Sequence, residues 1–210
     1  MESTYWYDVL VTSTDSAVER LLALAGDQPR ADARRNVRKL VEAAREAVAE
    51  VGVAVTAHEI ARRAGVGIGT FYRRLPSREA LLTAVFTDTL DELVAVARAA
   101  LDAPDPWAGF AEFAESYAQL RAASCGIRDV LGDSPLDLDI ETPVAELRGL
   151  IEQVVGRAQQ AGALRQDVTW QDIAFLLAAT MTGDDTIGLR APADQWRRNL
   201  RVILAGLQAS

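Results

Sequence analysis

The sequence has very few side chains that could hold a metal ion or form a disulfide bond. Its 210 residues include one histidine, His58, and one cysteine, Cys125. A lone cysteine cannot form an internal disulfide, which is typical of a protein from a reducing compartment. A lone histidine excludes a multi-histidine metal site and most catalytic triads. We therefore expect no metal site and no cofactor.

Long hydrophobic runs and targeting signals are also missing. No apolar run approaches the roughly 20 residues that cross a membrane, because Arg, Asp or Glu interrupts each one. The first residues, "MESTYWYDVL", lack the basic and apolar regions of a secretory signal. These absences predict a cytoplasmic protein with no membrane partner. Neither a phosphate-binding G-x-x-x-x-G-K-[ST] motif nor a nucleophile elbow is present, so we do not expect an enzyme.

Alternating strand patterns of useful length are absent, whereas apolar residues recur at helical spacing along most of the chain. Glycine and proline separate these helical segments. We therefore expect an all-α fold of about nine helices. The main expected helices are residues 33–51, 56–64, 67–75, 77–101, 107–123, 127–131, 142–161, 169–187 and 194–209. Residues 1–30 are expected to be a partly disordered N-terminal extension, with "DSAVERLLALAG" as a segment able to form about three helical turns.

The charge is distributed unevenly. The whole chain carries a net charge of −8, but residues 30–83 hold eleven basic and six acidic residues, a net charge of +5. The rest of the chain holds eleven basic and twenty-four acidic residues, a net charge of −13. A basic module joined to an acidic body is expected when one part contacts a polyanion such as DNA.

Two short helices in the basic module are joined by a tight turn that contains Gly65. Helices of about eight residues, 56–64 and 67–75, are too short to be stable alone, so their neighbours must brace them. Two short helices with a glycine turn are typical of a helix-turn-helix, which places its second helix in the major groove of DNA.

The start of the second short helix suits close approach to base edges. Gly67 and Gly69 carry no side chain that would hold the backbone away from the groove. Thr70 offers a hydroxyl and a methyl group to a phosphate or a base, and Ile68 offers an apolar contact to a thymine methyl. We predict that these residues determine the preferred DNA sequence.

The next residues divide between the core and the phosphate backbone. Phe71 and Tyr72 point about 100° apart on a helix, so we place Phe71 in the core and Tyr72 on the surface. Arg78 lies at the start of the following helix, where free backbone N–H groups also attract a phosphate. The residues predicted to contact DNA are Thr56, Gly67, Ile68, Gly69, Thr70, Tyr72, Arg73, Arg74 and Arg78.

The segment "VTAHEIARRAGVGIGTFYRRLPSREALLTAVF" closely resembles the DNA-binding domain of the tetracycline-repressor (TetR) family of bacterial transcriptional regulators. The resemblance covers residues 34–86. Three positions depart from the usual family pattern: Gly67 replaces a capping Ser, Arg74 a frequent His, and Leu75 the usual Phe. Loss of the serine cap costs a few tenths of a kcal/mol, on the order expected for Gly in that position.

The resemblance implies a homodimer that binds a palindromic operator, most often as a repressor. It also implies an N-terminal helix-turn-helix domain, residues 31–80, and a C-terminal helical domain, residues 81–210. The second domain would dimerise and bind a small-molecule effector, which releases the DNA. The effector cannot be named from the sequence. A different class, an all-helical small-molecule binding protein without DNA function, remains the alternative.

Two helical faces near the C-terminus are candidates for the dimer interface. Each face is apolar, and the other interpretation for each helix is packing in the core of its own chain. The predicted interface residues are Ile173, Leu177, Met181, Trp196, Leu200, Ile203 and Leu204.

Aromatic and soft residues of the middle helices are candidates for the effector site. Phe110, Phe113 and Tyr117 share one helical face, although such a stripe is more often core than pocket. A cysteine such as Cys125 is more often a small buried hydrophobe. The predicted ligand-binding residues are Trp107, Phe110, Phe113, Tyr117, Cys125 and Trp170. The adjacent acids Asp184 and Asp185 are predicted to lie in a solvated loop or helix end.

Overall fold

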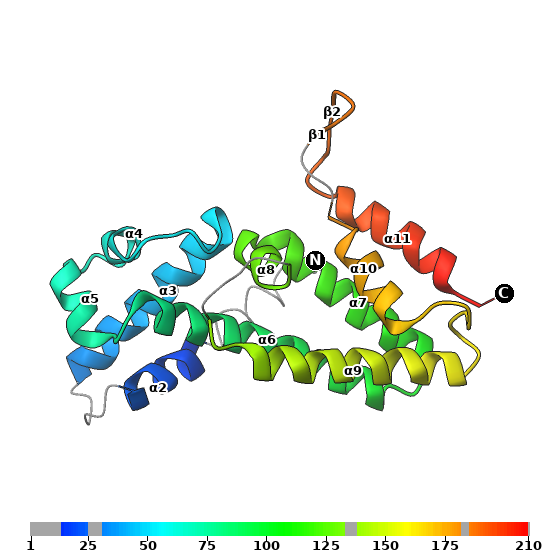
Figure 1. Ribbon diagram of the computed structural model, residues 1–210, viewed down its shortest axis with the longest axis horizontal. Helices are drawn as coiled ribbons and strands as arrows, with labels where there is room; N and C mark the ends of the chain where they lie inside the picture. The colour runs from blue at the N-terminus through cyan, green and yellow to red at the C-terminus, as the bar shows by residue number, and fades with distance from the viewer. Residues whose placement is uncertain (1–13, 25–30, 133–137, 182–184, 210) are drawn as a thin grey trace. The chain divides into compact units, whose positions relative to one another are not determined.

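The computed structural model describes residues 14–24, 31–132, 138–181 and 185–209. Figure 1 shows that these residues are almost entirely helical, which confirms the all-α prediction. One short antiparallel hairpin, of strands β1 (Asp185–Thr186) and β2 (Leu189–Arg190), accompanies the helices. No helix within the described ranges is long and apolar enough to cross a membrane.

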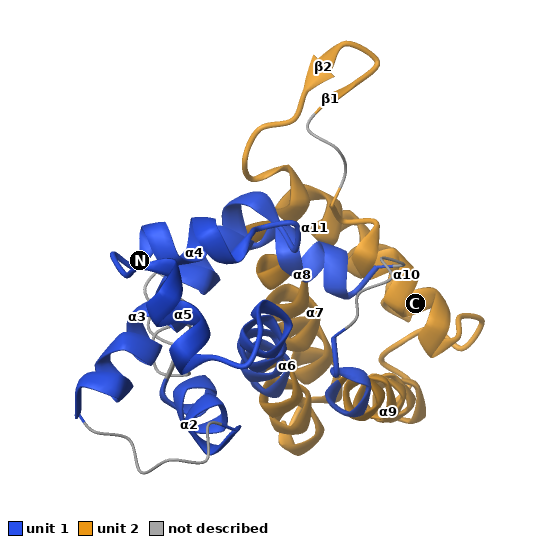
Figure 2. Ribbon diagram, turned by 60° about the vertical axis from the view of Figure 1, so that its left-hand side comes forward, with its two compact units in different colours: residues 1–92, 124–143 blue, residues 93–123, 144–210 orange. Residues whose placement is uncertain are grey.

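The chain divides into two compact units, coloured separately in Figure 2. Unit 1 comprises residues 1–92 and 124–143, and unit 2 comprises residues 93–123 and 144–210. The first part of helix α6 and all of helix α8 belong to unit 1. The helices of unit 1 are α2 (Thr14–Leu24), α3 (Ala31–Val51), α4 (Ala57–Arg63), α5 (Ile68–Arg74), the first part of α6 (Arg78–Asp102) and α8 (Cys125–Val130).

Helix α3 forms the centre of unit 1. Its buried residues include Val37, Leu40, Val41 and Val48, which recur at the spacing of one helical face. Gly52 follows with a φ of +85°, the left-handed conformation that ends many helices and that glycine adopts without strain. Helices α2, α4, α5 and α8 all pack on α3.

Helix α2 is an integral part of unit 1. The side chains of Ala17, Val18 and Leu21 are fully buried. Residues 15–24 of the segment predicted to form three helical turns are helical, while residues 1–13 and 25–30 of the predicted extension lie outside the described residues.

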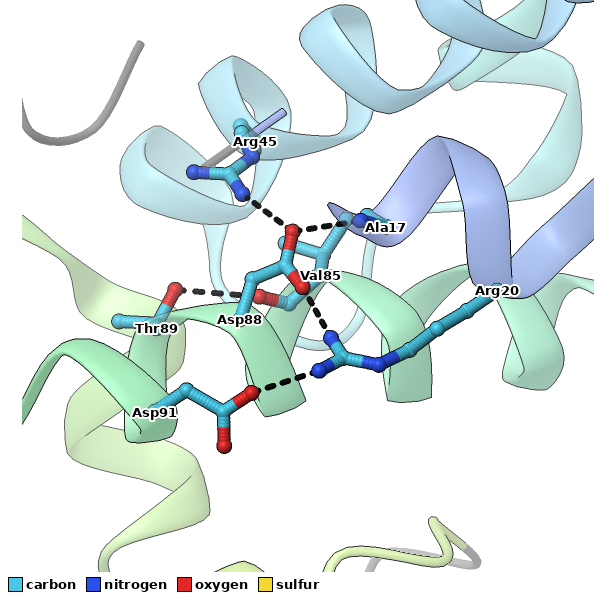
Figure 3. A network of polar contacts seen from close by, with 7 residues as sticks. All are labelled: Ala17, Arg20, Arg45, Val85, Asp88, Thr89 and Asp91. Atoms are coloured by element: carbon cyan, nitrogen blue, oxygen red, sulfur yellow. Dashed lines mark hydrogen bonds and ion pairs between the residues drawn. The ribbon is translucent and has the colours of Figure 1, made fainter. Parts of the chain in front are cut away.

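A buried carboxylate joins α2 to the rest of unit 1 (Figure 3). Asp88 on α6 accepts a hydrogen bond from the backbone N–H of Ala17 at 2.8 Å and pairs with Arg20 of α2 and with Arg45 of α3, the last at 2.9 Å. Burial raises the pKa of Asp88, while both guanidinium groups act in the opposite direction. The other terminal nitrogen of the Arg20 guanidinium, Nη2, donates a hydrogen bond to Oδ2 of Asp91 at 2.6 Å.

Helix α8 comes late in the chain but packs closely on α3. A Cβ built on Gly126 would lie 2.2 Å from Cγ1 of Val48. Only glycine at position 126 therefore lets α8 approach α3 this closely. Asp129 accepts a hydrogen bond from the backbone N–H of Val53 at 3.0 Å. This carboxylate therefore holds the turn that leads from α3 into α4.

Unit 2 contains the end of α6, α7 (Pro106–Ala123), most of α9 (Glu141–Gln160), α10 (Trp170–Ala178) and α11 (Gln195–Leu207). Helix α7 is central, since α10 and α11 both pack on it. Arg157 of α9 donates hydrogen bonds to the carbonyl oxygens of Ala100 and Ala103 at the end of α6. A capping box of Thr169 and Asp172 begins α10.

The predicted helix over residues 169–187 is wrong in its second half. Helix α10 ends at Ala178, and the β1–β2 hairpin lies beyond it. Ile187 and Gly188 both have positive φ, as a two-residue hairpin turn of type I′ requires. Asp185 belongs to β1, and Asp184 lies outside the described residues.

Candidate DNA-binding surface and effector site

Helix α4 begins with a side-chain cap. The backbone N–H of Glu59 donates to Oγ1 of Thr56 at 3.2 Å, so the capping pattern predicted the start of this helix correctly. Thr56 itself is exposed. The carboxylate of Glu59 accepts hydrogen bonds from Arg62 and Arg63, and these guanidinium groups lower its pKa to about 2.

A glycine turn connects α4 to α5. Gly65 has a φ of +66°, and the N–H of Val66 closes the turn on the carbonyl oxygen of Ala61 at 3.0 Å. Gly67 is the N-cap of α5, and its carbonyl oxygen accepts from the N–H groups of Thr70 and Phe71. No side chain caps the helix, as expected when glycine occupies this position.

The two adjacent rings of α5 point in different directions. Phe71 is fully buried, whereas Tyr72 is 57% exposed. Their ring centroids lie 5.1 Å apart with the rings at 70° to each other, so the edge of one meets the face of the other. This arrangement confirms the predicted division between a core ring and a surface ring.

The glycines at the start of α5 face open space. A Cβ built on Gly67 or Gly69 would meet no atom within 4 Å, and neither residue has a positive φ. Neither packing nor backbone conformation therefore requires glycine at these positions. A requirement for glycine would have to come from a partner that approaches the helix from outside.

The polar side chains of α5 surround this open end. Arg73 is exposed and donates to Oγ1 of Thr70 at 3.2 Å. Ile68 and Thr70 are partly exposed. Arg74 is also partly exposed, but its Nε atom is buried and has no hydrogen-bond partner among the described residues. A threonine, a tyrosine and two arginines thus share a seven-residue helix that has no acidic residue.

Arg78 has a contact that the sequence did not reveal. Its guanidinium group donates to the carbonyl oxygens of Val53 and Val55 and lies 3.1 Å from Oε1 of Glu79. The side chain therefore holds the turn between α3 and α4. Ser77 caps α6 by accepting from the N–H of Ala80 at 3.0 Å.

His58 is exposed on α4. In the described part of the chain, no group of three or more histidine, cysteine, aspartate or glutamate side chains is arranged to hold a metal ion. These described segments therefore contain no candidate metal site built from such side chains.

The predicted dimer residues fall into two groups. Ile173, Leu177, Trp196 and Leu200 are buried within their own chain, so these four cannot be offered to a second copy. This corrects the prediction, because the apolar stripes of α10 and α11 pack against α7 and against each other. The remaining predicted residues, Met181, Ile203 and Leu204, are partly exposed.

The exposed apolar side chains of unit 2 are different residues. They are Phe175 on α10, Val202 on α11, and Ile187 and Leu189 on the hairpin. Phe175 is 76% and Val202 is 73% exposed. Periodicity identified the apolar stripe of each helix, but these residues lie outside the stripe.

Most of the predicted effector residues lie on or near α7. Phe110, Phe113 and Tyr117 are buried, and the rings of Phe113 and Tyr117 have centroids 6.2 Å apart. Trp107 is partly exposed, with its ring 5.6 Å from that of Phe110. Trp170 is partly exposed at the start of α10.

Cys125 is separated from this set. It begins α8 in unit 1, and its sulfur accepts a hydrogen bond from Arg128 at 2.8 Å. Sequence reasoning also missed Arg121, which is buried on α7 one helical step beyond Tyr117. The spacing of four residues from Phe113 to Tyr117 to Arg121 was the available signal.

A short helix, a glycine turn and a second short helix with an exposed polar face, all braced on α3, define a helix-turn-helix DNA-binding protein. The family described as "Bacterial regulatory proteins, tetR family" matches residues 40–85. The family described as "Transcriptional regulator SbtR-like, C-terminal domain" matches residues 105–209. The chain belongs to the TetR family of transcriptional regulators and is a DNA-binding regulator of transcription.

Solved structures of TetR-family regulators are similar over most of the chain. A TetR transcription regulatory protein from Mycobacterium vanbaalenii is 34% identical, with a TM-score of 0.57, over 86% of this chain and 99% of that chain. SCO0520 from Streptomyces coelicolor is 24% identical, with a TM-score of 0.59, over 83% and 99%. AibR, in complex with isovaleryl coenzyme A and operator DNA, is 17% identical, with a TM-score of 0.62, over 82% and 97%. No curated protein sequence matches the chain.

Proposed function

We propose that this protein is a cytoplasmic repressor that binds a palindromic operator as a homodimer and releases it when a small molecule binds. The observation that carries the proposal is the open start of α5, where Gly67 and Gly69 leave room that no part of the described chain fills. The net charge of +5 over residues 30–83 supports a polyanionic partner. Regulation of transcription requires no catalysis, and we propose no enzymatic activity.

The roles on α5 follow from exposure and position. Ile68 and Thr70, in the first turn, contact base edges in the major groove. Tyr72 and Arg73 are exposed beside them and contact phosphates, which fix the register of the helix on DNA. Thr56 at the start of α4 adds a further phosphate contact, and the partly exposed Arg74 adds another.

The homodimer uses the exposed apolar side chains of unit 2. Phe175 and Val202 lie on α10 and α11, and the hairpin adds Ile187 and Leu189. Exposed aromatic and aliphatic side chains on neighbouring elements are typical of a protein interface. Met181, Ile203 and Leu204, which are partly exposed, extend the same set.

The effector binds in unit 2, next to α7. Helix α7 ends at Ala123, and Ser124, in an extended conformation, caps the next helix, α8, which packs on α3 and holds Val53 through Asp129. Effector binding beside α7 is proposed to act on the turn between α3 and α4 through this covalent link. AibR shows that a protein of this fold binds both a small molecule and operator DNA.

The direct test is binding of the purified protein to DNA from its own promoter region, measured by fluorescence anisotropy across salt concentrations. Phosphate contacts release counterions, so the logarithm of the binding constant should fall with the logarithm of salt with a slope of about −0.9 per phosphate neutralised. Tyr72→Phe should weaken binding to all DNA sequences equally, whereas Ile68→Ala should change the sequence preference. Absence of binding, or binding that ignores salt, would contradict the proposal.

A further inference from the structure

The guanidinium group of Arg121 is buried in unit 2, and the described residues offer it few hydrogen-bond acceptors. The residue is 8% exposed and lies in the last turn of α7. Its Nη1 donates to the hydroxyl of Tyr117 at a long 3.5 Å, and its Cζ lies 5.7 Å from the centre of the Tyr117 ring. Its Nε is buried and has no hydrogen-bond partner within the described residues.

A buried arginine normally has strong acceptors. The guanidinium carries a permanent charge and five N–H donors, so leaving water is costly unless carboxylates or carbonyl oxygens replace the lost hydration. Two partly buried arginines of this chain have such acceptors. Arg45 pairs with Asp88, and Arg157 donates to the carbonyl oxygens of Ala100 and Ala103. Among the described residues, Arg121 has only a neutral hydroxyl and a ring face instead.

The surroundings of Arg121 on α7 are aromatic on one side. Phe113, Tyr117 and Arg121 recur every four residues, so one helical face carries two buried rings followed by the buried cation. The acidic residues of this helix, Glu112 and Glu115, are exposed and lie on other faces. A molecule bound along this face would meet an apolar surface with one cationic end.

We propose that Arg121 binds the anionic group of the effector, and that the effector is a small organic acid. Its carboxylate or phosphate accepts two parallel hydrogen bonds from the guanidinium group, and its apolar part lies along Tyr117 and Phe113. The proposal deepens the effector binding proposed above and rests on it. It assigns to Arg121 a direct ligand contact, and to Tyr117 the positioning of the guanidinium through its hydroxyl.

The test measures binding of defined acids to the full chain by isothermal titration in low-chloride buffer. The probes are benzoate, octanoate and phenyl phosphate, with benzamide and octanamide as neutral counterparts and inorganic phosphate as the bare anion. We expect at least one organic acid to bind the wild-type protein, and its neutral counterpart to bind at least about tenfold more weakly. A preference for phenyl phosphate over benzoate would identify a phosphate rather than a carboxylate.

Variants separate the ligand contact from a structural role. Arg121→Met keeps the length of the side chain and removes the unsatisfied charge, so it should be no less stable than the wild type without ligand, while its acid affinity falls at least about tenfold. Arg121→Lys keeps the charge but loses the planar group that donates two parallel hydrogen bonds, so this variant should bind the acid with intermediate affinity. It serves as the test if Arg121→Met does not fold. Arg98→Met, which removes an exposed arginine of unit 2, should leave binding unchanged.

Four results would overturn the proposal: no acid in the panel binds the wild type, the amides bind as tightly as the acids, inorganic phosphate alone binds, or the Arg121 variants bind as tightly as the wild type. Operator binding is measured in the same preparations without acid. If DNA does not bind, the repressor function fails, while the acid titrations still decide the role of Arg121. If DNA binds and the acids do not, the assignment of Arg121 fails alone.

Discussion

At the scale of the single residue, the glycines of α5 show how an unfilled space indicates a partner. Gly52 and Gly65 have positive φ, so backbone conformation explains both of them. Gly69 has neither a positive φ nor a neighbour within 4 Å of a built Cβ. A helix interior ordinarily favours alanine over glycine, so the protein gives up stability at this position.

Gly69→Ala should raise the free energy of unfolding by about 0.5–1 kcal/mol, because alanine loses less conformational entropy in a helix. The added methyl group should weaken operator binding, because it holds the backbone away from the base edges. Urea denaturation and fluorescence anisotropy measure the two effects. Gly149→Ala in α9, another site with no neighbour within 4 Å, is the control and should change only stability. Unchanged operator affinity in Gly69→Ala would contradict the close approach of α5.

Glu59 gives the helix-turn-helix a dependence on acid pH. Its pKa is lowered from 4.5 to about 2 by Arg62 and Arg63, so the folded state favours the ionised form. The resulting stabilisation is present above pH 4.5 and is lost as the pH falls toward about 2. Glu59→Gln removes these ion pairs at all pH values. The difference in unfolding free energy between wild type and variant, measured by urea denaturation, should therefore shrink over this range, and a constant difference would argue against the ion pairs.

At the scale of the element, local patterns predicted the helices well and their surroundings poorly. The stripe of α3, the caps at Thr56 and Ser77 and the glycine turn at Gly65 depend on neighbours in sequence, and the structure has all of them. The end of α10 was missed because Met181 continues the apolar spacing of Ile173 and Leu177.

Surfaces and long-range contacts were harder to predict. Periodicity shows which residues share a face, but it does not show whether the same chain or a second copy covers that face. The burial of Ile173 within its own chain and the exposure of Phe175 therefore could not be predicted. The attachment of α8 to α3 depends on residues more than 70 positions apart, such as Val53 and Asp129. The burial of Arg121 depends on the tertiary packing around α7, which spacing alone does not give.

Helix α8 depends on Gly126 for its contact with α3. Although alanine favours helices, Gly126→Ala should lower the free energy of unfolding by about 1–3 kcal/mol, because the methyl group would collide with Val48 and press on Phe86. Urea denaturation measures this change, with Gly149→Ala again as the control that should be stabilised. A stabilised Gly126→Ala protein would show that α8 does not pack tightly on α3.

At the scale of the whole molecule, the proposed dimer depends on side chains that the monomer leaves exposed. Phe175→Glu places a charge where the interface would be dry, so it should shift the protein from dimer to monomer in light scattering at micromolar concentration. Operator affinity should fall with it, because two linked helix-turn-helix units bind more tightly than one. Leu24→Glu on α2, at another exposed apolar residue, is the control and should remain dimeric. A dimeric Phe175→Glu protein would place the interface elsewhere.

The cluster around Asp88 has a consequence for how this sequence can diverge. One carboxylate serves a backbone N–H of α2 and two arginines from different helices, Arg20 and Arg45. Loss of Asp88 would leave Arg45 without the carboxylate it pairs with, and loss of either arginine would remove part of the compensation for a buried charge. In homologues that retain α2, we therefore expect positions 20, 45 and 88 to be replaced together, so that co-variation of these three columns would trace which relatives share this attachment of the N-terminal helix.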